Sequence, residues 1–268
     1  MSLRIQNNVE AFNAHRNLSA TEERLATSME RLSSGYRINR AADDAAGLAI
    51  SERLRGQIGG LDQAQRNVQD AVSLVQTAEG SLTEIHAMLQ RVRELAVQYK
   101  NGSLSAADRT AIQSEVNQLG SEIERIGVSA EFNGTPLLST SSSITFQVGS
   151  NDAQTISVAT ISLGGTIGTT FHQLTQAGAT DISEIDVAID KVSAQRATFG
   201  AVQNRLEYTL NNLSTYRENL VASESRIRDV DMAAEMVNFT KLQILQQAGT
   251  SMLAQANQAS QGVLSLLR

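Results

Sequence analysis

The chain has 268 residues, a net charge of −6 at pH 7 and no cysteine. An acidic chain without a basic cluster is a poor ligand for nucleic acid or for an anionic membrane, and the lack of cysteine excludes disulfides and thiolate metal sites. No apolar run reaches the roughly 18 residues that a membrane span needs, and the first residues lack the apolar core of a secretory signal peptide.

The first predicted element is an N-terminal helix with a loose apolar pattern, formed by Ile5, Val9, Phe12, Leu18, Leu25 and Leu32. Ser33-Ser34-Gly35 ends this helix, and Asp43 and Asp44 stand where the next helix begins. Carboxylates at a helix N-terminus accept free backbone N–H groups and interact favourably with the helix dipole. The alternative, a catalytic carboxylate pair, is disfavoured because adjacent residues on a helix project about 100° apart.

The second predicted element is a long helix, because apolar residues recur at every seventh position: Leu61, Val68, Val75, Leu82, Leu89 and Ala96. A second row runs beside the first at Ala71, Ala78, Ile85, Val92 and Tyr99. This pattern is typical of a coiled-coil helix, here from near Asp43 to near Lys100, with about 58 residues and a length of about 87 Å.

A shorter helix is predicted to fold back on the long one. Asn101-Gly102 supplies a turn, and Ser105 with Asp108 indicates a capping box. The apolar residues that follow alternate between spacings of four and three, at Ile112, Val116, Leu119, Ile123 and Ile126.

The segment 134–180 predicts a small β-rich tip. The turn-forming sequence NGTPLLSTSSS at 133–143 leads into it, and Pro136 within this sequence is the only proline of the chain. Ile144, Phe146 and Val148 alternate with polar residues and indicate a strand, and Ile156 with Val158 indicates a second strand across a turn.

Two further helices are predicted after the tip. The first runs over about 183–226, with heptad residues Ile185, Val192, Phe199, Leu206, Leu213 and Leu220. The second follows Asp231, with one row at Leu245, Met252, Ala259 and Leu266 and a neighbouring row at Leu242, Gly249, Ala256 and Val263. The predicted fold is therefore mainly α, a long antiparallel helical bundle or coiled coil with a small β-hairpin tip, in which the N- and C-terminal helices pair.

No pattern of catalytic, cofactor-binding or metal-binding residues is present in the sequence. His15, His86 and His172 lie on three different predicted elements without a partner at metal-ligand spacing. Phosphate-binding and dinucleotide-binding glycine motifs are absent, and so is a Ser/His/Asp arrangement. We therefore expect a protein that is not an enzyme and that needs no cofactor.

The last helix is polar but almost uncharged, since Lys241 is the only charged residue between Met236 and Leu267. Its polar face consists of amides, among them Gln246, Gln247, Gln255 and Gln258. Amides donate and accept hydrogen bonds without a desolvated charge, which suits burial against other copies or the lining of a wet channel. The alternative is an ordinary amphipathic helix that frays in solution.

Several motifs, in the right order, resemble those of bacterial flagellins: LSSGYRINRAADDAAGLAISERLRGQ at 32–57, LQRVRELAVQ at 89–98, EFNGTPLL at 131–138, SRIRDVDMAAEM at 225–236 and VLSLLR at 263–268. The resemblance covers about residues 1–150 and 181–268. It implies a structural subunit that self-assembles into the flagellar filament for swimming. The short middle segment implies a minimal flagellin without the large outer variable domains.

The resemblance also implies an arrangement of domains. Residues 1–42 and 229–268 would form an inner core domain around the filament channel, and 43–228 an outer core domain. The spoke between them, residues 33–44, would place Gly35, Arg37, Arg40, Asp43 and Asp44 at subunit contacts, with the arginines pairing with carboxylates of neighbouring subunits. The polymerisation and channel helix would use Gln246, Gln247, Gln255, Gln258, Leu264, Leu266 and Leu267.

Partners and location follow from the same resemblance. The chain would leave the cell unfolded through the flagellar type III export apparatus, without a cleaved signal peptide, and would fold at the tip of the extracellular filament. Its expected partners are other copies of itself, the cap protein, the hook–filament junction protein and an export chaperone. Within the same superfamily it could be the junction protein itself, and from a different class a soluble coiled-coil signalling adaptor.

A host partner is implied as well, since Gln90, Arg91, Leu95 and Glu115 match the family positions that the flagellin-sensing Toll-like receptor contacts. The helical repeat places Arg91 about 140° and Leu95 about 100° from the centre of the apolar stripe. We therefore expect an exposed Arg91 beside a half-exposed Leu95, with Glu115 of the next helix within reach.

Overall fold

The structure is a computed structural model that describes residues 8–163 and 181–266, with side chains described up to 258. The helices are α1 (Val9–Ser34), α2 (Ala45–Tyr99), α3 (Ala106–Ser129), α5 (Asp181–Arg228) and α6 (Met232–Leu266). The strands are β1 (Glu131–Phe132), β2 (Thr135–Pro136), β3 (Ser143–Gln147) and β4 (Thr155–Ala159). The mainly helical fold predicted from the sequence is confirmed, with helix boundaries within a few residues of those expected.

The chain divides into two compact units. The terminal unit contains Met1–Gly56 and Asn219–Arg268, and the central unit contains Gln57–Glu218. The boundaries between the units fall inside α2 and α5. The sequence suggested domain boundaries at 42/43 and 228/229, just before the start of α2 and at the end of α5. That domain assignment stays a prediction.

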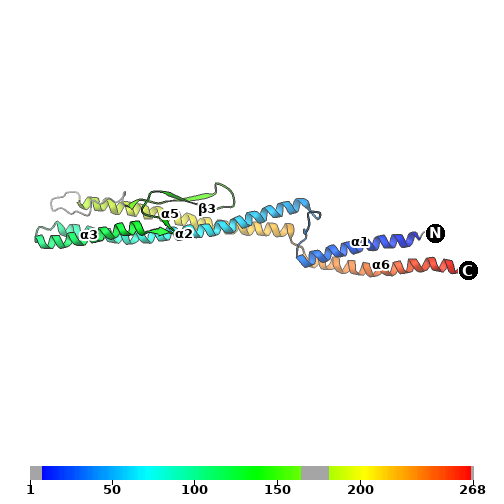
Figure 1. The fold of residues 1–268 in the computed structure, drawn as a ribbon. Coiled ribbons are helices and arrows are strands. Elements are labelled where there is room, and N and C mark those ends of the chain that lie inside the picture. The colour runs from blue at the N-terminus through cyan, green and yellow to red at the C-terminus, as the bar shows by residue number, and fades with distance from the viewer. Residues whose placement is uncertain (1–7, 164–180, 267–268) are drawn as a thin grey trace. The chain divides into compact units, whose positions relative to one another are not determined.

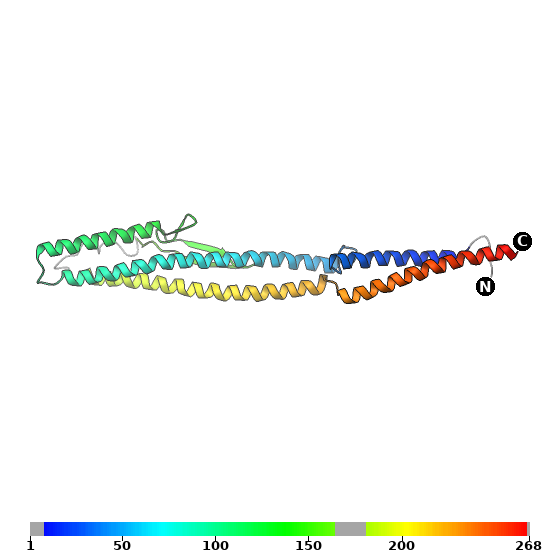
Figure 2. The ribbon, with the colours of Figure 1, turned by 90° about the horizontal axis from the view of Figure 1, so that it is seen from below.

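The central unit is built on the heptad repeats of α2 and α5, and α3 runs beside α2 in both views (Figures 1 and 2). The predicted row of α2 from Leu61 to Ala96 is buried throughout. The α5 row is buried from Ile185 to Leu213. Large side chains such as Phe199 and Leu206 thus form the core between the helices, as the seven-residue spacing predicted.

The two ends of α3 are fixed by local hydrogen bonds. At its start, the Asp108 N–H donates to Oγ of Ser105 at 3.2 Å and Oδ2 of Asp108 accepts from the Ser105 N–H at 3.0 Å, which confirms the predicted capping box. After its end, β1 and β2 form a two-residue hairpin through Asn133 (φ 50°) and Gly134 (φ 74°). A left-handed conformation at both turn residues is what a type I′ turn requires. The sequence predicted the turn but not the two short strands.

The predicted strands 144–148 and 156–158 are confirmed as the antiparallel pair of β3 and β4, in which Ile144 pairs with Val158 and Phe146 with Ile156. Nδ2 of Asn67 on α2 donates to the Gln147 carbonyl at 3.0 Å. The turn of the hairpin reaches α2 at Gly60, where an added Cβ would lie 2.9 Å from Cβ of Ser150. The rest of the predicted tip, residues 164–180, lies outside the described residues.

Candidate assembly surfaces

In the terminal unit, a short antiparallel backbone bridge joins the segment after α1 to the segment between α5 and α6. Tyr36 pairs with Asp229, the Arg37 N–H donates to the Arg228 carbonyl at 2.7 Å, and the Val230 N–H donates to the Gly35 carbonyl at 3.0 Å. Gly35 caps α1 in the left-handed region with φ 75°, where a side chain would be strained. The spoke motif thus builds a joint between the end of α1 and the start of α6.

Arg228 connects this joint to α2. Its Nη1 lies 2.6 Å from Oε1 of Glu52, and its guanidinium lies 4.8 Å from the centre of the Tyr36 ring. The hydrogen bond from Arg228 holds the pKa of Glu52 below its usual value. The Arg228 side chain is only 14% exposed. This role of Arg228 is not predictable from the sequence, because its position in the SRIRDVD motif does not indicate simultaneous contacts with Glu52 and Tyr36.

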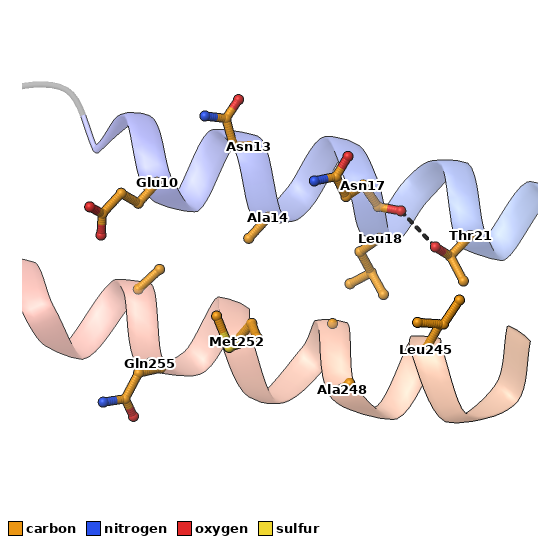
Figure 3. A pocket seen from close by; sticks show the side chains of 12 residues that line it. Glu10, Asn13, Ala14, Asn17, Leu18, Thr21, Leu245, Ala248, Met252 and Gln255 are labelled. Atoms are coloured by element: carbon orange, nitrogen blue, oxygen red, sulfur yellow. Dashed lines mark hydrogen bonds between the residues drawn. The ribbon is translucent and has the colours of Figure 1, made fainter. Parts of the chain in front are cut away.

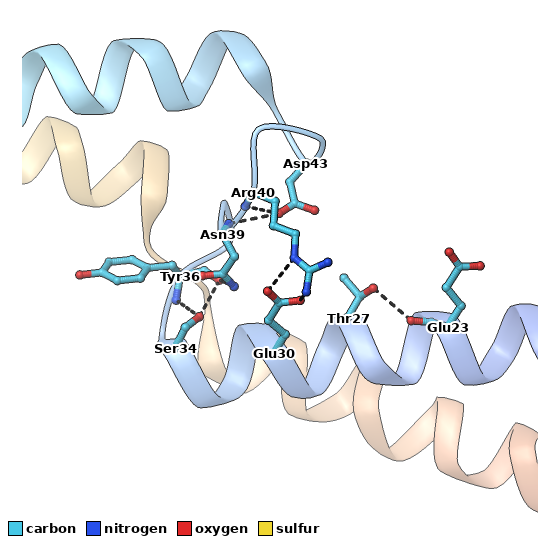
Figure 4. Close-up of polar contacts among 8 residues, drawn as sticks. All are labelled: Glu23, Thr27, Glu30, Ser34, Tyr36, Asn39, Arg40 and Asp43. Atoms are coloured by element: carbon cyan, nitrogen blue, oxygen red, sulfur yellow. Dashed lines mark hydrogen bonds and ion pairs between the residues drawn. The ribbon is translucent and has the colours of Figure 1, made fainter.

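The two aspartates of the spoke have different roles. Oδ1 of Asp44 accepts the Gly47 N–H at 2.8 Å, so Asp44 caps the start of α2 as predicted. The prediction is wrong for Asp43, which turns back and accepts the N–H groups of Arg40 at 2.9 Å and Asn39 at 3.1 Å (Figure 4). These backbone donors, that of Arg40 first, lower the pKa of Asp43. Asp43 therefore closes the spoke loop instead of starting the helix.

The spoke arginines have partners within the chain. Both nitrogens of Arg40 that face α1 pair with the Glu30 carboxylate at 3.0 Å (Figure 4). Nη2 of Arg37 donates to the Ile227 carbonyl at 2.6 Å. The side chain of Arg40 is 72% exposed, so it keeps most of its surface for further contacts. Pairing of these arginines with other subunits stays a prediction.

α1 and α6 lie side by side and antiparallel (Figures 1 and 2). One end of the pair is fixed where Oγ of Ser28 donates to Oε1 of Glu235 at 2.5 Å, and the other where Nδ2 of Asn8 donates to the Ala256 carbonyl at 2.9 Å. A Cβ added to Gly249 would lie 3.2 Å from Leu18. The least exposed residues of α6 recur in steps of four and three, at Glu235, Phe239, Leu242, Gln246, Gly249, Leu253 and Ala256. Of the two predicted rows of α6, the one with Leu242, Gly249 and Ala256 is therefore the seam.

The other predicted row of α6 borders an open groove between α1 and α6. Leu245 and Met252 lie on one wall of this groove and Leu18 on the other (Figure 3). They leave much apolar surface open, since Leu245 is 46% and Met252 64% exposed.

The amides of α6 divide between these surfaces. Gln246 is half-buried in the seam, whereas Gln247, Gln255 and Gln258 are exposed. The side chains of Leu264 and Leu266 lie outside the described part of α6, and Leu267 lies outside the described residues altogether. Among the described side chains of α6, none is fully buried.

Large apolar side chains on the terminal helices face solvent. Examples are Phe12 of α1 at 70% and Val237 and Ile244 of α6 at 70% and 61%. α1 buries Ser28 alone among its residues. A monomeric protein rarely leaves this much apolar surface open on one element, so these faces are candidate contact surfaces.

The predicted receptor patch is partly assembled on the central unit. Nε of Arg91 donates to Oε1 of Glu115 at 3.0 Å, and Nη1 lies 3.2 Å from Oε2 of Glu94. Gln90 is exposed and lies 3.0 Å from the His86 ring. The expectation of a half-exposed Leu95 is wrong, because its exposed fraction is 2%. More than one helix covers α2 at this level, which widens its buried arc beyond the stripe that the heptads predicted.

Other kinds of site are not found in the part of the chain that the structure describes. Over residues 8–163 and 181–266, no three His, Asp or Glu side chains come together as metal ligands. Within the same ranges, no helix is both long and apolar enough to cross a membrane.

Comparisons with known proteins agree with this architecture. The bacterial flagellin N-terminal helical region matches residues 5–143, and the bacterial flagellin C-terminal helical region matches 182–267. The flagellin of Bacillus subtilis strain 168 is 48% identical over 99% of this chain and 100% of its own length, and that of Halalkalibacterium halodurans is 49% identical over 98% and 99%. The crystal structure of Bacillus cereus flagellin aligns with a TM-score of 0.50 and 35% identity over 59% of this chain and 94% of that one. The chain therefore belongs to the bacterial flagellin family, as a compact member of it.

Proposed function

We propose that this chain is the structural subunit of a bacterial flagellar filament and polymerises with copies of itself. The observation that carries the proposal is the terminal unit, where α1 and α6 meet along a narrow seam and leave large apolar side chains open. Other copies in a helical polymer would cover these faces. Full burial of a Val, Leu, Ile or Met side chain contributes about 1.5–3 kcal/mol.

The route to the filament follows from the family. The chain is exported unfolded through the flagellar type III apparatus and folds at the tip of the extracellular filament beneath the cap protein. The hook–filament junction protein is its neighbour at the base, and a chaperone holds the C-terminal helix before export. The role is structural and requires no catalytic step.

A host receptor is a further proposed partner. The Arg91–Glu115 pair and Gln90 present charged and amide groups on one exposed surface of the central unit, at positions that match the family's Toll-like receptor contacts. Leu95 is buried beneath this surface and belongs to the core of the central unit. The glutamates beside Arg91 raise the pKa of its guanidinium, with Glu115 making the larger contribution.

The alternative within the superfamily, the hook–filament junction protein, differs in what it builds. Whole-length identity to proteins named flagellin favours the filament subunit. Negative-stain electron microscopy of the purified chain after polymerisation tests the proposal: a filament subunit gives long filaments, whereas a junction protein or a coiled-coil adaptor gives short or discrete particles.

A truncation sharpens this test. Removal of 254–268 takes away the end of α6, including Leu264, Leu266 and Leu267. We expect the truncated chain to form no filaments while circular dichroism still shows the helices of the central unit. Normal filaments from the truncated chain would refute the assignment of α6 as a polymerisation helix.

A further inference from the structure

The methionines of this chain are unevenly distributed. Of the six, Met1 lies outside the described residues and Met88 is half-buried on α2. The other four lie on the terminal helices and are exposed: Met29 at 55%, Met232 at 48%, Met236 at 50% and Met252 at 64%. A flexible thioether is a common choice at adaptable contact surfaces, but in solvent it is also open to oxidants.

Three of these methionines project to the same side of the helix pair. Ser28 and Glu235 face each other through their 2.5 Å hydrogen bond. Met29 and Met236 each follow one of these residues, and in two antiparallel right-handed helices this step of about 100° turns both side chains to one side. Met232 lies one turn before Met236 on the same face of α6. Met252 lies on the other side, in the groove with Leu245 (Figure 3).

We propose that Met29, Met232 and Met236 form an oxidation site that decides whether a free subunit can join the polymer. The inference rests on the proposed function, since it assumes that neighbouring copies cover this side of the pair. The substrate class is a two-electron oxygen donor such as hydrogen peroxide. The composition favours these residues, because the chain contains neither Cys nor Trp to react in their place.

The reaction is a single oxygen transfer. A lone pair on the thioether sulfur attacks one oxygen of hydrogen peroxide, and the O–O bond breaks. The sulfur is oxidised by two electrons to the sulfoxide, and the departing hydroxide takes the remaining proton and leaves as water. Each event adds one oxygen atom to the chain and converts an apolar side chain into one that carries a strong hydrogen-bond acceptor.

The change affects the polymer more than the subunit. In the free chain the sulfoxide oxygens are solvated, so folding of the central unit is unaffected. In a subunit contact they are desolvated without partners, which we expect to raise the critical concentration for polymerisation by about tenfold or more. Methionine sulfoxide reductases reverse the modification, so the block is reversible.

The experiment compares polymerisation of purified monomer before and after limited treatment with hydrogen peroxide, with peptide mass spectrometry to locate the added oxygens. We expect Met29, Met232, Met236 and Met252 to be oxidised before Met88, and the critical concentration to rise. The triple variant Met29→Leu, Met232→Leu, Met236→Leu keeps the apolar volume and should polymerise equally well with and without peroxide. Reductase treatment of oxidised wild type should restore its polymerisation.

Two single variants serve as controls. Met252→Leu and Met88→Leu should both remain as sensitive to peroxide as wild type. Protection by Met252→Leu alone would assign the effect to the groove and overturn the site proposed here, as would unchanged polymerisation of fully oxidised wild type. Failure of untreated wild type to form filaments would instead refute the proposed function, so the two failures are distinguishable.

Discussion

Two neighbouring glycines of α2 should respond in opposite directions to the same substitution. Gly59 is exposed, and a Cβ added to it meets nothing within 4 Å. At Gly60 the added Cβ would lie 2.9 Å from Cβ and 3.3 Å from Cα of Ser150, at the turn of the β3–β4 hairpin. Because the second contact is with backbone, rotation of a side chain cannot relieve it and the hairpin has to move.

The magnitudes follow from these two environments. Ala is favoured over Gly inside a helix by about 1 kcal/mol, so Gly59→Ala should stabilise the central unit by about that amount. Gly60→Ala gains the same propensity but incurs an overpacking penalty of about 1–3 kcal/mol. We expect the two variants to differ by about 1–3 kcal/mol, which corresponds to roughly 2–4 °C in Tm for each kcal/mol in a unit of this size.

The assay is thermal unfolding of the monomer followed by circular dichroism, together with hydrogen exchange at the Val148 N–H, which donates to the Gln154 carbonyl at 2.8 Å. Gly60→Ala should lower Tm relative to Gly59→Ala and speed exchange at Val148. Ser150→Gly removes the closer contact and should recover part of the loss. Equal Tm shifts for the two alanine variants would show that the hairpin does not rest on Gly60.

Three further predictions concern other parts of the chain. Limited proteolysis of the free subunit should trim about residues 1–40 and 230–268 first, because α1 and α6 bury so little; resistant ends would contradict this. The hydroxyl and N–H of Ser105 hold the pKa of Asp108 below its usual value, so the capping carboxylate contributes stability above the ordinary aspartate pKa and loses it as the pH falls through the lowered one. In an NMR titration, Ser105→Ala should move the midpoint of Asp108 upward, and an unchanged midpoint would exclude the hydroxyl as the cause. In a reporter-cell assay with the Toll-like receptor, Arg91→Ala monomer should signal less than wild type, with Arg93→Ala as a charge-matched control; equal signalling by Arg91→Ala and wild type would refute the patch.

The long helices were predictable because one physical rule determines them. Apolar residues at every seventh position of α2 and α5 form one stripe on each helix, and the observed core follows that register. The capping box of α3 and the strands β3 and β4 were equally predictable, since short-range hydrogen bonds and period-two alternation require no knowledge of tertiary contacts. The short β1–β2 hairpin was missed because its strands have only two residues each.

The predictions that the structure contradicts concern positions whose contacts come from other parts of the fold. Leu95 is buried because more than one helix packs against α2 at this level. A helical wheel of α2 alone does not show how many helices surround it. The role of Asp43 is not predictable from the sequence, because it depends on a loop conformation that brings the N–H groups of Asn39 and Arg40 to its carboxylate. Arg228 was overlooked for a related reason: its partners Glu52 and Tyr36 come from a helix and a loop distant in sequence.

The composition of the α1–α6 seam gives a reason to expect that the terminal unit is stabilised by other copies. Small residues such as Ala14 and Gly249 bring the helices close but bury little apolar area, and Ser28 with Glu235 places a polar pair where a leucine would stabilise most. Such a pair separates readily, which suits the unfolded export proposed for this chain. The same helices keep Phe12, Val237 and Ile244 exposed. Burial of this apolar surface would stabilise the helices, and it requires contact with another subunit. From the weak seam and the open outer faces, we therefore expect folding of the terminal unit to depend on assembly.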